Sequence, residues 1–325
     1  MIGLDYQRRL SQLLSESVGS YWVDQKSGFD YLYEASRDFS KEVKAFHNTA
    51  DIATVASQTE YSLPPDFMEI LTQDGYGNKT IQFTDLSGNV SWLSRIGYGK
   101  LLWENNTTSV SNPTEFAITD GFPADRLIGT ATANGVNSGG ESVLTDINAD
   151  FSSVSVGDSV VNTTRNYIGV VLSTYGVMTT QSGQKILTQS GIPITTTLLV
   201  TAMFDVSSSQ SAYANWTAGD NYFIQPQSVY DIVVNPPPAT SGMIISVPYI
   251  CRPFPVYSDY GSYSFATGYE EALLKYAVWL YKYRDSKGNQ GDALYRYYDQ
   301  QIRKAKNIHR GATTPKSFRV SFINR

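Results

Sequence analysis

The chain has 325 residues, of which 41% are hydrophobic and 17% are charged, with a formal net charge of -5 at pH 7. This length allows a sizeable buried core and more than one folding unit. The composition excludes a disordered polymer and favours a globular protein rich in β structure. The negative charge argues against nucleic-acid binding over the whole surface, because such binding depends on cationic residues that neutralise phosphates.

Tyrosine is unusually frequent, with 23 copies beside 14 Phe and 5 Trp. Tyr provides wide apolar contact and a polar hydroxyl at low entropic cost, so an excess of Tyr is typical of protein interfaces. A β-rich composition is an equally good explanation, and both remain open at this point.

The sequence also indicates the compartment. Cys251 is the only cysteine, which excludes an internal disulfide and fits a reducing environment. The first residues, MIGLDYQRRL, lack the apolar core of a signal peptide, and no apolar run approaches the length of a membrane span. We therefore expect a soluble protein that is cytoplasmic where it is made.

In chain order, the first expected elements are two helices, at residues 4–18 and 28–47. Apolar residues in the second helix recur at steps of three and four and form one stripe for burial against a partner. From about residue 51 to residue 118 the sequence changes to short β segments separated by Gly, Asn and Pro. The corner Leu63–Asp66 contains two prolines, which fix φ and remove amide donors, so a stiff turn is expected there.

A second β-rich stretch follows, at residues 125–227, rich in Thr, Ser, Gly and Val. Two Gly-Asp pairs, at Gly157-Asp158 and Gly219-Asp220, each precede an alternating strand pattern and predict turns. We interpret this stretch as a small antiparallel barrel or sandwich inserted into the first unit.

The last third of the chain predicts two strands around a proline-rich turn, then an antiparallel helix pair joined at residues 286–290. The expected fold class is α+β: a helical bundle from N- and C-terminal helices plus an antiparallel β layer, with an inserted small all-β barrel or sandwich domain. The expected organisation is a core of residues 1–124 and 228–311, an inserted β domain of residues 125–227 and an extended C-terminal tail of residues 312–325.

Candidate catalytic and metal-binding residues are few. The two histidines, His47 and His309, lie at the end of an amphipathic helix and in a basic segment, and neither has a partner at ligand or triad spacing. Cys251 lies on an apolar strand and is expected to be a small buried hydrophobic residue. We therefore expect no enzyme, with no catalytic residues, no metal and no cofactor.

Two acidic patterns have competing explanations. Asp30, Glu34 and Asp38 share one helix face, which suits acid–base chemistry, but nearby Lys and Arg favour a solvated or subunit-contact face. Residues 146–151 begin like an EF-hand calcium loop, with three alternating Asp and Asn residues. The loop lacks the glycine at its sixth position and the glutamate at its twelfth, which disfavours bound calcium.

The order of these segments resembles the head-to-tail adaptor proteins of tailed bacteriophages. The segments that carry the resemblance are QTEYSLPPDFMEI after the first helices, PTEFAITDG, the strand pair YDIVVNPPP and GMIISVPYICRPFP, and the closing helix pair YEEALLKYAVWLYKYRDSKGNQGDALYRYYDQQIRKAKN. The likeness covers roughly residues 1–122 and 228–310, and the stretch between them departs from it as an insertion.

The resemblance implies a structural protein of the virion neck: a connector ring, dodecameric, beneath the portal. Its partners would be identical subunits, the portal protein, a downstream tail or neck protein, and DNA that passes through the channel without sequence-specific binding; a membrane is not an expected partner. In such a protein the corner at Leu63–Asp66 would fix the angle between bundle and β layer, with an ordinary turn as the alternative.

Two sets of residues are candidates for these contacts. A closed ring requires heterologous interfaces, so aromatic helix residues beyond the needs of one core are candidate intersubunit contacts. These are Tyr276, Trp279, Tyr283, Tyr295 and Tyr298. The basic tail can pair as an extra strand with a sheet edge of a partner, and the family likeness makes it the portal anchor, with a frayed terminus as the alternative. The anchor residues would be Arg310, Lys316, Phe318, Arg319, Phe322 and Arg325.

Two other classes of function stay open. Trp216 and Tyr222 in the β insert suggest a carbohydrate-binding or host-attachment module. The other class is a hydrolase whose catalytic carboxylates cannot be paired from the sequence. Glycan binding by the isolated insert would favour the first, and turnover of a polysaccharide would favour the second.

Overall fold

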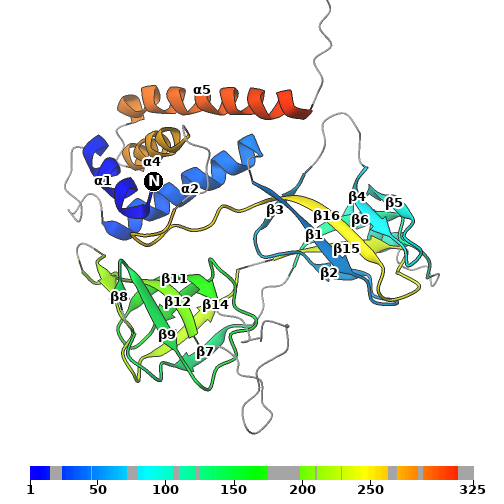
Figure 1. Ribbon diagram of the computed structural model, residues 1–325, viewed down its shortest axis with the longest axis horizontal. Helices are drawn as coiled ribbons and strands as arrows, with labels where there is room; N and C mark the ends of the chain where they lie inside the picture. The colour runs from blue at the N-terminus through cyan, green and yellow to red at the C-terminus, as the bar shows by residue number, and fades with distance from the viewer. Residues whose placement is uncertain are drawn as a thin grey trace, which may run out of the picture.

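The chain forms two eight-stranded β-sheets and five helices within the residues that the computed structural model describes (Figure 1). The described residues are 1–14, 24–44, 46–71, 79–104, 110–121, 125–135, 137–174, 198–208, 211–227, 229–262, 269–284 and 288–313. Helices from both ends of the chain lie together, above the second sheet and to the left of the first sheet in this view.

Local capping residues determine where the helices begin and end, and their apolar stripes determine which face is buried. They are α1 (Gly3–Leu14), α2 (Gln25–Val43), α3 (Tyr98–Glu104), α4 (Glu270–Arg284) and α5 (Gly288–Thr313). Asp24 caps α2, because its Oδ1 accepts a hydrogen bond from the Ser27 amide at 2.7 Å. Lys44 ends α2 in a left-handed conformation, with φ of 56°. The helix therefore starts and ends earlier than the predicted 28–47, and His47 begins a strand.

The first sheet is built from strands on both sides of the insert. They are β1 (His47–Ala53), β2 (Glu60–Ser62), β3 (Phe67–Ile70), β4 (Lys79–Thr84), β5 (Val90–Arg95), β6 (Glu115–Asp120), β15 (Tyr230–Asn235) and β16 (Ile244–Cys251). Their order is β1-β16-β4-β5-β6-β15-β2, with β3 also on β16, and β5 and β6 are the one parallel pair among these described strands. Phe83, Phe116, Ile245 and Tyr249 lie in its buried core.

The second sheet uses only residues of the predicted insert. Its strands are β7 (Leu127–Thr130), β8 (Asn137–Ser138), β9 (Glu141–Thr145), β10 (Ser159–Asn162), β11 (Tyr167–Thr174), β12 (Leu198–Asp205), β13 (Tyr213–Ala214) and β14 (Asn221–Gln225). Their order is β7-β14-β10-β11-β12-β9-β8, with β13 on β12. The two predicted Gly-Asp turns are confirmed, since Gly157 and Gly219 have φ of 94° and 91°.

The chain leaves and re-enters the first sheet at one point. Asp120 at the end of β6 pairs with Tyr230 at the start of β15, and the Gly121 amide donates to the Val229 carbonyl at 2.9 Å. The second sheet is therefore inserted between the end of β6 and the start of β15, which are neighbours in the first sheet. The domain boundaries themselves, at residues 125 and 227, stay a prediction.

The predicted fold class, a helical bundle with an added β layer, is wrong. Sixteen strands in the described residues form two sheets, each with its own apolar core, and the apolar cluster of the helices is shared with the second sheet. Their apolar cluster also contains Leu172, Ala202 and Phe204 from the second sheet. The error has a physical reason: helical stripes give a strong periodic signal, whereas strands of two to eight residues give a weak one.

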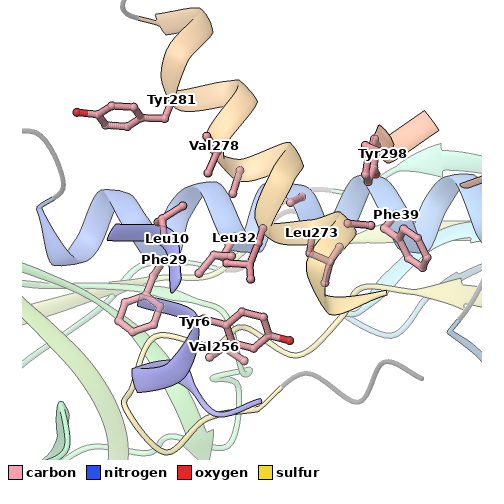
Figure 2. Close-up of a cluster of buried hydrophobic side chains, with 14 of the residues drawn as sticks. Tyr6, Leu10, Phe29, Leu32, Phe39, Val256, Leu273, Val278, Tyr281 and Tyr298 are labelled. Carbon is pink, nitrogen blue, oxygen red and sulfur yellow. The ribbon is translucent and has the colours of Figure 1, made fainter. Parts of the chain in front are cut away.

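Figure 2 shows the contact among the helices at this cluster. Leu10 of α1, Leu32 of α2 and Leu273 of α4 are fully or almost fully buried together. Tyr257, in the segment that connects β16 to α4, lies 6.0 Å from Phe29 of α2 between ring centroids. One apolar cluster therefore joins the N-terminal helices, the C-terminal helices and the second sheet.

Candidate interaction surfaces

Four of the five predicted intersubunit aromatics, those with described side chains, converge on one face of the α4–α5 pair. Ring centroids of Tyr276 and Tyr298 lie 4.3 Å apart, and those of Trp279 and Tyr295 lie 4.8 Å apart. Tyr276 and Trp279 are also neighbours, at 5.3 Å. The two helices thus build one continuous aromatic cluster.

Tyr298 lies at the bottom of this cluster, inside the subunit. Its side chain is 1% exposed, and its hydroxyl donates to Oδ2 of Asp38 on α2 at 2.7 Å. Burial raises the pKa of the Tyr298 hydroxyl, and the negative charge of Asp38 raises it further. The hydroxyl therefore stays protonated and donates to the carboxylate. Tyr276 is half-buried, and burial followed by the charges of Asp38 and Glu34 raises the pKa of its hydroxyl too.

Tyr295 and Trp279 form the outward part of the cluster. Tyr295 is 45% exposed, and Trp279 is half-buried beside it. Tyr283 lies within α4, but its side chain is outside the described residues. The aromatic surface available to a partner is therefore centred on Tyr295, with Tyr298 as its internal support.

Sequence reasoning missed a cation contact next to this surface. The Lys275 ammonium lies 3.5 Å from the ring centroid of Tyr297, and it forms an ion pair with Glu271 at 2.9 Å. The four-residue spacing of Glu271 and Lys275 is the signal that could have predicted the ion pair. The α4–α5 face thus combines aromatic rings with a paired charge.

The predicted portal anchor falls almost entirely beyond the described chain. Lys316, Phe318, Arg319, Phe322 and Arg325 lie outside the described residues. Arg310 lies near the end of α5, and its side chain is not described either. Their role as an anchor stays a prediction.

The proline corner connects the first sheet to the linker that leads to the helices. Tyr249 on β16 donates from its hydroxyl to Oδ1 of Asp66 at 2.9 Å, and the Arg252 amide donates to the Asp66 carbonyl at 2.7 Å. The Arg252 guanidinium in turn donates to Oε1 of Gln227, where the chain leaves the second sheet. The corner is therefore part of a joint between three parts of the fold.

A pocket of about 380 Å³ lies at this joint. Its lining comes from the corner, from α2, from loops of the second sheet and from the segment after β16; Tyr33, Asp66, Val154, Gln227, Arg252 and Phe254 are among the lining residues. Gln227 is fixed by its amide, which donates to Oδ1 of Asp158 at 3.0 Å. Burial raises the pKa of the Asp158 carboxyl, while hydrogen bonds from the Ser155 and Gln227 amides act against this shift.

The EF-hand-like segment is held by hydrogen bonds within the second sheet. Oδ2 of Asp146 accepts from the Tyr222 hydroxyl at 2.9 Å and from the Thr130 amide at 3.2 Å, and Oδ1 accepts from the Asn148 amide at 2.9 Å. Burial and Asp146 raise the pKa of Tyr222. Asp146 also lines a pocket of about 310 Å³, but it is only 3% exposed and its carboxylate accepts the hydrogen bonds given above. These contacts give Asp146 a structural role.

The aromatics that suggested carbohydrate binding fill the core of the second sheet. Trp216 is 1% exposed, its Nε1 donates to Oγ1 of Thr201 at 3.0 Å, and its ring packs 5.9 Å from that of Tyr222. Neither ring can stack on a sugar from this position. The described structure therefore gives no support to a glycan site at these two residues.

Within the described chain, no group of three or more His, Cys, Asp or Glu side chains is placed to hold a metal ion. His47 is exposed on β1, and the His309 side chain is outside the described residues. None of the described helices is both long and apolar enough to cross a membrane.

Comparison with known families finds a likeness to an adaptor protein family over the first part of the chain. The matching family model is described as SU10 adaptor protein, and it matches residues 3–135, less than half of the chain. The match runs from α1 through β7 and covers the corner at Leu63–Asp66. No curated protein matches the chain.

Proposed function

We propose that this protein is the subunit of a ring that joins a phage capsid to its tail. The ring docks beneath the portal and continues the DNA channel towards the tail. The observation that carries the proposal is the adaptor family match over residues 3–135. The exposed aromatic face of α4 and α5 and the basic C-terminal tail support the ring and the portal contact.

A ring needs two different surfaces on each subunit, because head-to-tail contacts close only when unlike surfaces meet. The exposed edge of the aromatic cluster, with Tyr295 and Trp279, supports one of them. Tyr and Trp are enriched in protein interfaces because they bury much area at a low entropic cost. We assign this face of α4 and α5 to the contact with the neighbouring subunit, and a dodecamer is the stoichiometry that the family likeness favours.

Partners along the channel axis complete the proposal. The C-terminal tail carries Lys316, Arg319 and Arg325 and no acidic residue, which suits attachment to an acidic groove of the portal by strand addition. The remaining chain is net acidic, which suits a channel through which DNA moves without being held. A downstream tail or neck protein would take the opposite end of the ring.

Light scattering on size-separated samples tests the proposal. The purified protein is measured alone and after mixing with its portal at physiological salt. We expect the mixture to contain a complex whose mass equals the portal plus a closed ring of these subunits. If the protein stays separate from the portal at every concentration, the proposed docking is wrong.

A further inference from the structure

Strand β1 forms one end of the first sheet, and no described strand pairs with its outer edge. Its inner edge pairs with β16 over its full length. One residue past β1, the Thr54 amide donates to the Met243 carbonyl at 2.7 Å. In an antiparallel pair, main-chain groups alternate between the two edges, so the even-numbered residues of β1 bond to β16. Asp51 and Ala53 therefore direct their N–H and C=O groups outwards.

This edge has little protection against pairing. Strand β1 contains no proline and no lysine, and most of its seven residues are exposed. The Thr49 amide is satisfied locally, because it donates to Oδ1 of Asn48 at 2.9 Å. Proteins usually cover or interrupt an open edge of this length, because it is a template for a further strand.

The two faces of β1 specify what such a strand would need. Ala50 and Ile52 face the buried core of the first sheet and are packed against it. Asp51 faces the opposite side, where its Oδ1 accepts a hydrogen bond from Oγ of Ser246 at 2.6 Å. A matching strand needs apolar side chains next to Ala50 and Ile52 and a basic side chain next to Asp51.

The C-terminal helix ends near the start of this edge. The hydrogen bond of Tyr298 with Asp38, followed by the ion pair of Lys306 with Glu42, shows that α5 runs in the same direction as α2. Helix α2 leads directly into β1, and the end of α5 lies beside that connection in Figure 1. The last twelve residues of the chain, if extended, reach about 40 Å, whereas β1 needs about 23 Å.

We propose that the segment Lys316–Ile323 of the same chain adds to β1 as a parallel strand. In this register Phe318 and Val320 lie beside Ala50 and Ile52 and extend the core, while Arg319 lies beside Asp51. The alternation of apolar and basic residues in the segment matches both faces of β1. The docked segment would cover the open edge on the free subunit.

This strand would then have two alternative partners, its own β1 and a sheet edge of the portal. The competition rests on the proposed portal attachment, whereas docking on β1 does not. The test below uses no portal, so its failure is distinguishable from failure of the proposed function.

Hydrogen exchange read at single amides tests the proposal on the full chain and on a variant that ends at Thr313. We expect the amides of Asp51 and Ala53 to exchange at least about tenfold faster in the shortened chain. The Ile232 amide, in central strand β15, is the internal control and should not change. A peptide of residues 314–325 should restore the protection, and a scrambled peptide should not. Equal exchange in the two chains would overturn the proposal.

Charge exchange tests the register. In Asp51→Lys the Ala53 amide should lose its protection from exchange, because the new lysine lies beside Arg319 and repels it. The double variant Asp51→Lys, Arg319→Glu should restore the protection, because it places opposite charges side by side again. Asp51 is exposed, so unchanged thermal unfolding should show that both variants fold. Protection should be independent of protein concentration. Protection that falls on dilution would overturn the assignment to the same chain and place the strand on a neighbouring copy.

Discussion

The hydroxyl of Tyr298 on α5 donates a hydrogen bond to the carboxylate of Asp38 on α2, across 260 residues of sequence. The bond sits at the bottom of the aromatic cluster, where Tyr276 stacks 4.3 Å from Tyr298 between ring centroids. The last helix is thereby fixed to an early one. The aromatic residues consequently divide into an internal support and an outer surface, and this division can be tested.

Tyr298→Phe should destabilise the subunit by about 1.5–3 kcal/mol, because it removes a buried hydrogen bond to a carboxylate while keeping the ring. Urea unfolding measures the change. Tyr295→Phe is the matched control on the same helix, and it should have almost no effect because Tyr295 is largely exposed. Equal losses of stability in the two variants would contradict the division.

Tyr295→Ala should weaken assembly while leaving the free energy of unfolding within about 0.5 kcal/mol of its original value. The reason is that an exposed aromatic residue contributes mainly when a partner covers it. Sedimentation of the assembled protein measures the effect. Tyr260→Ala removes another exposed tyrosine, outside the aromatic cluster, and should leave assembly intact. An unchanged assembly in the Tyr295 variant would remove α4 and α5 as the proposed ring interface.

Replacing residues 125–227 with a short Gly-Ser linker should leave a chain that still folds cooperatively. The linker has little distance to span, because Asp120 pairs with Tyr230 beside the splice point. The deletion also removes Leu172, Ala202 and Phe204 from the cluster under the helices. We therefore expect a lower melting temperature and increased binding of a hydrophobic dye. Loss of the cooperative melt would show that the two sheets are not separable.

Cys251 should react slowly with thiol reagents in the folded protein. Burial raises the pKa of its thiol, and the negative charge of Asp66 raises it further, so the reactive thiolate is less populated at mildly alkaline pH. Labelling should accelerate strongly when the protein is unfolded in urea. A folded-state rate equal to that of an unstructured cysteine peptide would contradict this partly buried environment of Cys251.

Asp146 should matter for stability without binding calcium. Asp146→Asn replaces an acceptor by a donor next to the Tyr222 hydroxyl and the Thr130 amide, so it should cost about 1–3 kcal/mol. Added calcium and added chelator should both leave the melting temperature of the original protein unchanged. A calcium-dependent rise in that temperature would contradict the structural role.

Local signals in the sequence predicted individual turns and the β-rich second part of the chain, although the predicted fold class was wrong. The turns at Gly157 and Gly219 depend on a positive φ that glycine accepts, so two residues suffice to reveal them. The location of the second sheet between residues 125 and 227 followed from composition and alternation. The proline corner was also visible, because two prolines exclude a helix.

Local signals in the sequence could not predict which strands pair with each other. The order β1-β16-β4-β5 depends on contacts between residues nearly 200 positions apart, and no periodicity encodes them. The same holds for the aromatic sites. Tyr295 and Tyr298 look alike in the sequence, and their exposure differs because α2 places Asp38 against one of them. The contacts of Asp66 at the joint could not be predicted either, because its partners Tyr249 and Arg252 lie far away in the sequence, on β16 and in the linker that follows it.

The most direct test of the central claim is electron microscopy of the purified protein bound to its portal. The account predicts one closed ring of this chain beneath the portal, coaxial with its channel, with α4 and α5 at the contacts between neighbouring subunits. A portal without such a ring at saturating protein, or density for this chain elsewhere on the particle, would contradict the account.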